Sequence, residues 1–162
     1  MSPRVLVAGI GNIFFGDDAF GPAVLSRLAR EPMAGTRYED FGIRGMHLAY
    51  ELLAGYGAAV LVDAVSRGGA PGTLYVIEPS EPVVATEADA HRMDLGSVFG
   101  FVRLLGGVAP PITIVGCEPE RLDEGADLSE TVARAVDAAL PLVRRIAGDL
   151  LARSEDRIWS RA

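Results

Sequence analysis

The segment 5–22 constrains the fold more than any other part of this 162-residue chain. It opens with an apolar run rich in Val and Leu, which predicts a buried strand, and Gly9 and Gly11 then allow a sharp turn. Two adjacent carboxylates, Asp17 and Asp18, follow before a proline begins an amphipathic stretch with helical spacing. A strand that passes through a tight turn into a helix is typical of an α/β sheet. The acids at this turn favour metal or peptide chemistry over phosphate binding.

Hydrophobic periodicity and turn residues predict five strands and four helices. The strands are expected at about 4–9, 36–41, 58–64, 73–78 and 111–117, and the helices at about 20–30, 46–55, 94–106 and from Ser129 onward. Only about eight residues separate the third and fourth strands. Because a parallel crossover needs about a dozen residues or more, we expect the fourth strand to be antiparallel. The predicted fold class is α/β, a three-layer α/β/α sandwich with a mixed five-stranded sheet.

The chain is expected to form a single domain. Residues 1–152 are predicted to form the α/β unit, and residues 153–162 a polar C-terminal tail that frays. The apolar stretch near the N-terminus is too short for a signal peptide, and no run reaches the roughly 20 apolar residues of a membrane span. We therefore expect a soluble, cytoplasmic protein that does not bind membranes.

Composition excludes several classes of function. The net charge of −7 argues against a nucleic-acid partner. All 15 basic residues are Arg, so the chain has no lysine for a phosphate-binding loop, a Schiff base or general-base catalysis. The single cysteine, Cys117, excludes an internal disulfide and a metal site made only of cysteines.

Carboxylates end three of the predicted strands. Asp17 and Asp18 follow the first strand. Glu39 and Asp40 end the second, and Asp63 ends the third. Ligands of open α/β sheets bind beyond the carboxyl ends of the parallel strands, so these acids are expected where function usually lies. Close carboxylates repel one another unless they bind a cation or share a proton.

Each acid also has a structural explanation. Asp17 or Asp18 could simply cap the following helix, and Asp40 could be a solvated strand end. Asp63 is harder to explain in this way, because a charge on a buried strand is costly without a partner. Sequence alone therefore favours Asp63 as a functional residue and leaves the other acids open.

Further side chains are candidates with weaker support. His91 lies in a polar segment and could be a metal ligand or a surface residue, whereas His47 is interpreted as structural. Cys117 ends an apolar strand and is expected in the core. Glu118 and Glu120 could border the same site, but nothing in the sequence separates them from surface acids.

A dinucleotide-binding turn is the alternative interpretation of the segment Gly9–Asn12. That fingerprint needs a third small residue three positions after the second glycine, where Phe14 stands instead. The two aspartates that follow would also repel a pyrophosphate. We therefore regard a dinucleotide-binding enzyme as the weaker hypothesis.

These residues together resemble the hydrogenase maturation proteases, the endopeptidases that remove a C-terminal extension from the large-subunit precursor of nickel-iron hydrogenases. The resemblance extends to about residue 152 and rests on an ordered set of motifs: Gly9–Asn12 with Asp17, Asp18 and Gly21; Asp40 with Gly45 and Met46; Val62–Ala64; Ala70–Thr73; His91 with Leu95; and Gly116–Glu120.

The resemblance implies roles for particular residues. The family's metal-contacting triad corresponds to Asp18, Asp63 and His91, and its acid linked to recognition of the nickel-bearing precursor corresponds to Asp40. Phe41 and Arg44 depart from the small residues common at their positions, which leaves the substrate preference open. The family fold has a mixed five-stranded sheet with an antiparallel fourth strand, in agreement with the loop-length argument.

The resemblance implies two possible mechanisms. The metal could polarise the scissile carbonyl or activate water, or Asp18 and Asp63 could share a proton as an aspartic-type catalytic pair. Nickel is expected to be carried by the precursor, and no nucleotide is expected. A non-catalytic chaperone that senses nickel in the precursor would use the same triad and remains an alternative. The oligomeric state cannot be inferred from the sequence.

Overall fold

The computed structural model describes residues 3–79 and 95–159. The described residues form a five-stranded sheet with the order β2-β1-β3-β5-β4. The strands are β1 (Val5–Ile10), β2 (Thr36–Gly42), β3 (Ala58–Ala64), β4 (Leu74–Ile77) and β5 (Ile112–Cys117). Four strands are parallel, and β4 pairs antiparallel with β5. The predicted mixed sheet with an antiparallel fourth strand is therefore confirmed.

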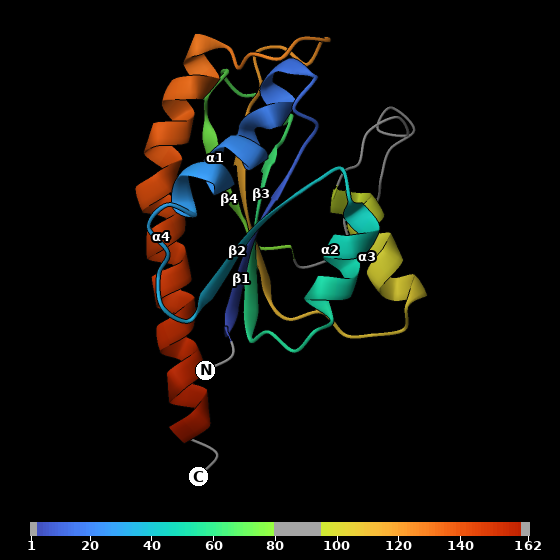
Figure 1. The fold of residues 1–162 in the computed structure, drawn as a ribbon, viewed down its shortest axis with the longest axis vertical. Helices are drawn as coiled ribbons and strands as arrows, with labels where there is room; N and C mark the ends of the chain where they lie inside the picture. Colours follow the sequence, from blue (N-terminus) through green and yellow to red (C-terminus); the bar gives the residue numbers. More distant parts are fainter. Residues whose placement is uncertain (1–2, 80–94, 160–162) are drawn as a thin grey trace.

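Helices cover both faces of this sheet. They are α1 (Phe20–Leu28), α2 (Gly45–Leu52), α3 (Leu95–Leu104) and α4 (Glu130–Trp159), with a short 3-10 helix, η1 (Gly16–Ala19), before α1. Figure 1 shows α1 and α4 on one side of the sheet and α2 and α3 on the other. The expected three-layer α/β/α sandwich is confirmed. The sequence patterns did not predict η1, which is the element that carries Asp17 and Asp18.

Successive side chains of the central strands point to opposite faces of the sheet and form two hydrophobic cores. On β3, Val60 and Val62 pack with α1 and α4, whereas Ala59 and Leu61 pack with α2 and α3. Side chains of a strand alternate between the two faces of the sheet, so a central strand needs apolar residues at nearly every position. This requirement explains the continuous apolar runs at 5–10 and 58–62.

Helix α4 is longer than predicted. Its N-terminus is capped by Ser129, whose Oγ accepts a hydrogen bond from the backbone N–H of Val132 at 3.3 Å. The helix continues through Pro141, which lies on its exposed face, and ends at Trp159. Residues 153–159, where the sequence predicted a polar tail that frays, are therefore helical. Among the described residues, no helix is both long enough and apolar enough to cross a membrane.

Candidate active site

The carboxyl ends of β1, β2 and β3 lie side by side at one end of the sheet. We use the word edge for this end, where the parallel strands finish, and opposite edge for the end where they begin. The turns after β1 and β2 are joined directly by a backbone hydrogen bond from the N–H of Gly11 to the carbonyl of Gly42, at 3.0 Å. Asp40 lies near the end of β2, and Asp63 lies near the end of β3. The prediction that the parallel strands carry acids to a common edge agrees with this arrangement.

Close backbone contacts hold η1 and α1 against this edge. A Cβ atom added to Gly11 would lie 1.8 Å from the carbonyl oxygen of Asp18, so only glycine allows the two backbones to meet. A Cβ atom added to Gly21 would lie 2.3 Å from the carbonyl oxygen of Ile10 and 2.4 Å from that of Val62. The start of α1 therefore rests on the ends of β1 and β3, next to Asp63.

Asp18 and Asp63 reach this edge from different elements. Asp18 is half-buried, and its Oδ2 accepts a 2.7 Å hydrogen bond from the backbone N–H of Asn12. Asp63 is buried, with 6% of its surface exposed. Because Asp63 follows Leu61 by two residues in β3, it lies on the side of the sheet that α2 and α3 cover.

Asp17 has a different role from its neighbour. It is fully buried, and its carboxylate accepts hydrogen bonds from the backbone N–H groups of Glu120, Arg121 and Ser129 and from the Ser129 hydroxyl, at 2.7–3.0 Å. Burial by itself raises the pKa of Asp17, but these hydrogen bonds outweigh burial and hold the pKa below its usual value. The suggestion that Asp17 caps its own helix was wrong, because no side chain caps η1 or α1. Asp17 instead fixes η1 to the segment before α4.

Glu118 is a buried structural acid that the sequence patterns could not distinguish from surface acids. Its carboxylate accepts hydrogen bonds from the backbone N–H groups of Arg67 and Gly68 and from the Tyr75 hydroxyl. Burial raises the pKa of Glu118, but these hydrogen bonds bring it below the usual value. Glu118 thus orders the loop that follows Asp63. Glu120, by contrast, is exposed.

Cys117 is a core residue, as predicted, and is fully buried. Burial, together with the charges of Asp17 and Glu118, raises the pKa of its thiol to about 12. A thiol with this pKa is protonated at neutral pH and is a poor nucleophile. Cys117 therefore has no role in the chemistry proposed for this edge.

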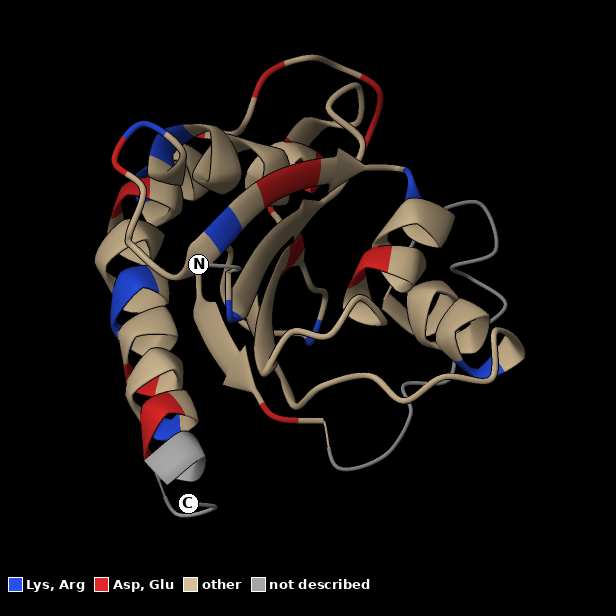
Figure 2. Ribbon diagram, turned by 60° about the horizontal axis from the view of Figure 1, so that its bottom comes forward, with Lys and Arg blue, Asp and Glu red and all other residues tan. Residues whose placement is uncertain are grey.

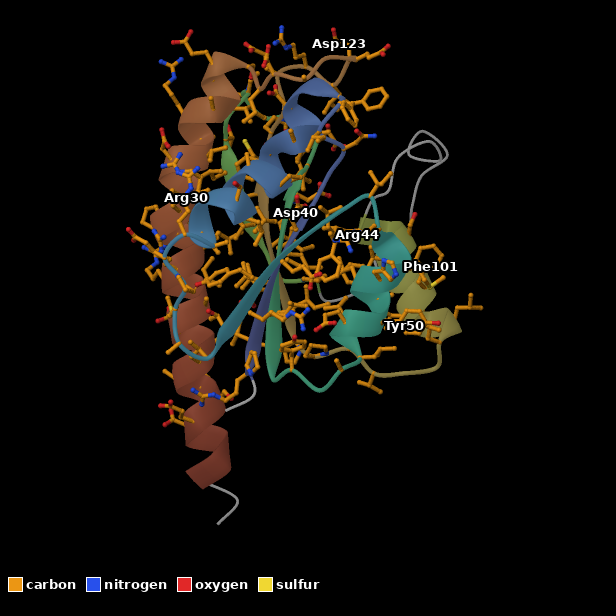
Figure 3. All side chains as sticks on the ribbon, in the orientation of Figure 1. Arg30, Asp40, Arg44, Tyr50, Phe101 and Asp123 are labelled. Atoms are coloured by element: carbon orange, nitrogen blue, oxygen red, sulfur yellow. The ribbon has the colours of Figure 1, made fainter. Side chains whose placement is uncertain are left out.

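Asp40 is exposed at the end of β2. Its Oδ1 accepts a 2.8 Å hydrogen bond from the backbone N–H of Gly42, and its carbonyl oxygen accepts one from Arg44. Figure 3 shows Asp40 and Arg44 on the strand and the turn that lead to α2. One carboxylate oxygen of Asp40 thus orders the turn, and the other accepts no hydrogen bond from the described residues.

His91, the third member of the predicted triad, lies outside the described residues. Among the described residues, 3–79 and 95–159, no group of three His, Cys, Asp or Glu side chains is arranged to hold a metal ion. Asp18 and Asp63 are the members of the triad that the structure describes. His47 is exposed at the start of α2.

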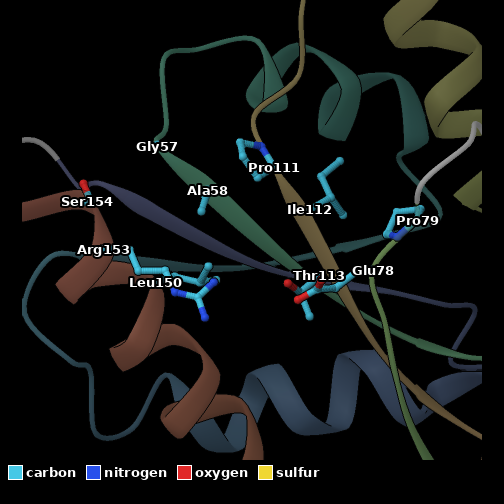
Figure 4. Close-up of a pocket in the computed structure, with 10 residues that line it drawn as sticks. All are labelled: Gly57, Ala58, Glu78, Pro79, Pro111, Ile112, Thr113, Leu150, Arg153 and Ser154. Atoms are coloured by element: carbon cyan, nitrogen blue, oxygen red, sulfur yellow. The ribbon is translucent and has the colours of Figure 1, made fainter. Parts of the chain in front are cut away.

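A pocket of about 540 Å³ lies at the opposite edge of the sheet. Figure 4 shows that it is lined by the first residues of β3 and β5, the segment after β4 and the C-terminal part of α4, including Leu150 and Arg153. The carboxyl ends of the parallel strands, and with them Asp18 and Asp63, are at the other edge. Because ligands of open α/β sheets bind at the carboxyl ends, this pocket is not the candidate active site.

Known proteins resemble this chain over most of its length. The sequence profile of the hydrogenase maturation protease family matches residues 27–146. The hydrogenase 2 maturation protease of Escherichia coli is 32% identical over 145 residues, which cover 86% of this chain and 88% of that protein. The hydrogenase expression/formation protein HupD of Rhodobacter capsulatus is 32% identical over 85% of this chain and 68% of its own length.

Solved structures agree with this result. The hydrogenase maturating endopeptidase HybD from Escherichia coli is similar with a TM-score of 0.75 and 29% identity, over 86% of this chain and 89% of that one. A hydrogenase 2 maturation peptidase from a Thaumarchaeota archaeon gives a TM-score of 0.68 and 30% identity, over 90% and 98% of the two chains. The alternative of a dinucleotide-binding enzyme is thereby rejected. From its sequence and its fold, the chain belongs to the hydrogenase maturation protease family.

Proposed function

We propose that this chain is the endopeptidase that removes the C-terminal extension of a nickel-iron hydrogenase large-subunit precursor after nickel has been inserted. The observation that supports this most strongly is the convergence of two acidic elements at one sheet edge. Gly11 and Gly21 allow η1 and α1 to pack closely against the ends of β1 and β3. Asp18 lies in η1, and Asp63 lies in β3. The relatives are named as maturation proteases and a maturating endopeptidase, which supports a peptidase.

The proposed triad is Asp18, Asp63 and His91, which contacts the nickel that the precursor carries. His91 is included because the family resemblance assigns its position to the triad, and its place beside Asp18 and Asp63 is part of this proposal. Two carboxylates and one imidazole suit nickel or zinc and leave coordination positions open for the substrate.

A metal-assisted mechanism is the one we propose. The hydrogen bond from the backbone N–H of Asn12 holds the Asp18 carboxylate in place at the strand ends, which suits a positioned ligand of the substrate's nickel. The nickel of the substrate polarises the scissile carbonyl, and water attacks it as a carboxylate takes up the proton. The scissile C–N bond then breaks as this proton passes to the leaving amine. Asp40 is proposed to recognise the nickel-bearing precursor from the end of β2.

The setting of this reaction is proposed to be the cytoplasm. A single buried thiol, with no second cysteine for a disulfide, agrees with a reducing compartment. The proposed partner is the large-subunit precursor, with neither nucleic acid nor membrane involved.

The test is to incubate the protein with nickel-loaded precursor and with nickel-free precursor, and to measure the intact mass of the large subunit. We expect loss of the C-terminal segment only from the nickel-loaded precursor. Binding of the nickel-loaded precursor without any loss of mass would instead indicate the non-catalytic chaperone. Equal cleavage of both precursors would contradict the proposed role of nickel.

A further inference from the structure

Two loops at the candidate active site expose large apolar side chains. The loop after β1 exposes Ile13, Phe14 and Phe15, the turn after β2 exposes Ile43, and the start of α2 exposes Met46. Phe14 is 64% exposed and Ile43 is 56% exposed. We call these five residues the apolar rim. Exposed apolar residues that gather at one place commonly mark an interaction site, whereas single ones do not.

Backbone hydrogen bonds fix the exposure of the first loop. The N–H of Phe14 donates to Asn12 Oδ1 at 2.9 Å, and the carbonyl of Phe14 accepts from the N–H of Gly125 at 2.8 Å. The N–H of Gly16 donates to the carbonyl of Gly125 at 2.9 Å. The loop is therefore held from both sides, and its aromatic rings are presented to solvent by an ordered backbone. A preorganised aromatic residue loses little conformational entropy on binding.

The second loop is ordered too, and it adjoins the first. The N–H of Arg44 donates to the carbonyl of Phe41 at 2.8 Å, and the guanidinium of Arg44 lies over the ring of Phe41. The bond between Gly11 and Gly42 joins the two turns. The rim is also continuous with the candidate active site, because the N–H of Asn12, the residue before Ile13, is bonded to the Asp18 carboxylate.

The loop 123–127, which is acidic, is hydrogen-bonded to the loop after β1 that carries part of the rim. Asp123, Glu124 and Asp127 are exposed, and no ion pair neutralises them within the described part of the chain. Gly125, between them, is the residue that holds the loop after β1. Figure 2 shows acidic residues, in red, on a loop at the top of the view, and Figure 3 labels Asp123 at the end of the molecule where the parallel strands finish. A partner at the rim thus meets apolar side chains beside a negative charge.

We propose that the apolar rim docks a segment of the large-subunit precursor that carries apolar side chains together with a basic residue. The apolar side chains of this precursor segment cover Phe14 and Ile43, and its basic residue faces the acidic loop 123–127. The segment adjoins the bond that is cut, because the rim adjoins Asp18. This proposal rests on the proposed function, and it assigns to the rim the binding of substrate and not the chemical step.

The test is the double variant Phe14→Ser with Ile43→Ser, assayed on nickel-loaded precursor. We expect KM to rise at least about tenfold, as for the loss of buried aromatic anchors at interfaces, while kcat and the thermal melt stay close to wild type. Phe14→Leu should retain most of the binding. The matched control is Val108→Ser, because Val108 is 91% exposed and precedes β5 at the opposite edge of the sheet. This control should leave KM unchanged.

A second variant tests the charge. Glu124→Gln with Asp127→Asn should raise KM, and the increase should shrink at high salt, because added salt screens the attraction in the wild type. Unchanged KM in the Phe14 and Ile43 double variant would overturn the docking proposal. An Asp63→Asn variant that still binds the precursor but does not cleave it separates docking from chemistry. If Asp63→Asn cleaves normally, the proposed function fails, whatever the rim variants do.

Discussion

Asp17 and Asp18 are adjacent in the chain but point to different surroundings. Asp17 is fully enclosed and accepts four hydrogen bonds from residues 120–129, more than 100 positions away. Asp18 is half-buried and faces the turn after β1. Local sequence could not separate the two roles, because the donors to Asp17 come from a distant segment that only the folded chain brings near. The same reason applies to Glu118, whose donors follow β3.

Replacement of Asp17 by Asn should destabilise the fold. The amide would turn an NH₂ group toward backbone donors that the carboxylate now satisfies, at a cost of about 1–3 kcal/mol. Because the folded pKa of Asp17 is lowered, its stabilisation is complete above about pH 4 and is lost as the pH falls further. Chemical denaturation at several pH values should therefore show a smaller loss of stability in acid for the variant than for the wild type.

Asp149→Asn, at an exposed acid on α4, is the control and should change stability little. An equally stable Asp17→Asn protein at pH 7 would contradict the structural role of Asp17.

The elements of the sheet could be predicted well, since each buried strand needs a continuous apolar run and each run is short. The range Ala58–Ala64 agrees with the prediction for the third strand, and the short connection after it correctly indicated an antiparallel β4. The 3-10 helix η1 could not be predicted, because its four residues have no periodicity and its position depends on contacts with the segment before α4. The length of α4 was underestimated, because its charged last turns lack the apolar spacing that indicates a packed helix.

The contact between α1 and the strand ends predicts that alanine has opposite effects on stability at two helical glycines, Gly21 and Gly148. Gly21→Ala would push a methyl group onto the carbonyl oxygens of Ile10 and Val62 and should cost at least about 1–3 kcal/mol, with loss of cleavage. Gly148→Ala in α4 meets nothing within 4 Å and should raise stability by roughly 0.5–1 kcal/mol. Thermal melts of the two variants and a cleavage assay check the contrast. A Gly21→Ala protein as stable and active as the wild type would show that this close approach is not needed to form the site.

One edge of the sheet combines Asp18 and Asp63, the apolar rim and an acidic loop. The opposite edge carries a pocket that is lined by the first residues of β3 and β5 and by the C-terminal part of α4. The rule for strand ends predicted that Asp17, Asp18 and Asp63 lie at one edge of the sheet. The choice of Asp18 over Asp17 and the inclusion of His91 rested on the family resemblance, because spacing does not separate the two neighbours and does not bring the segment of His91 to the sheet. The rim could not be predicted, since its residues are apolar and give the same signal in sequence as core residues.

Free nickel should bind the isolated protein weakly. Three ligands without a thiolate make a modest site, and the cysteines of the precursor should hold the ion more firmly. Calorimetry with nickel should therefore show no tight stoichiometric binding by the protein alone. Tight binding of one nickel ion per chain would favour a carrier of nickel over a protease that checks for nickel in its substrate.

The proposal that the edge with Asp18 and Asp63 is the proteolytic site is tested most directly by Asp63→Asn. The change is nearly isosteric, so β3 should remain packed, but it removes the negative charge that either mechanism requires. The measurement is release of the C-terminal segment from nickel-loaded precursor, per folded molecule, by mass spectrometry beside a thermal melt. We predict a loss of cleavage of at least about a hundredfold, with a melt that holds or rises because repulsion between carboxylates is relieved. Near-normal cleavage by a well-folded Asp63→Asn protein would contradict the account.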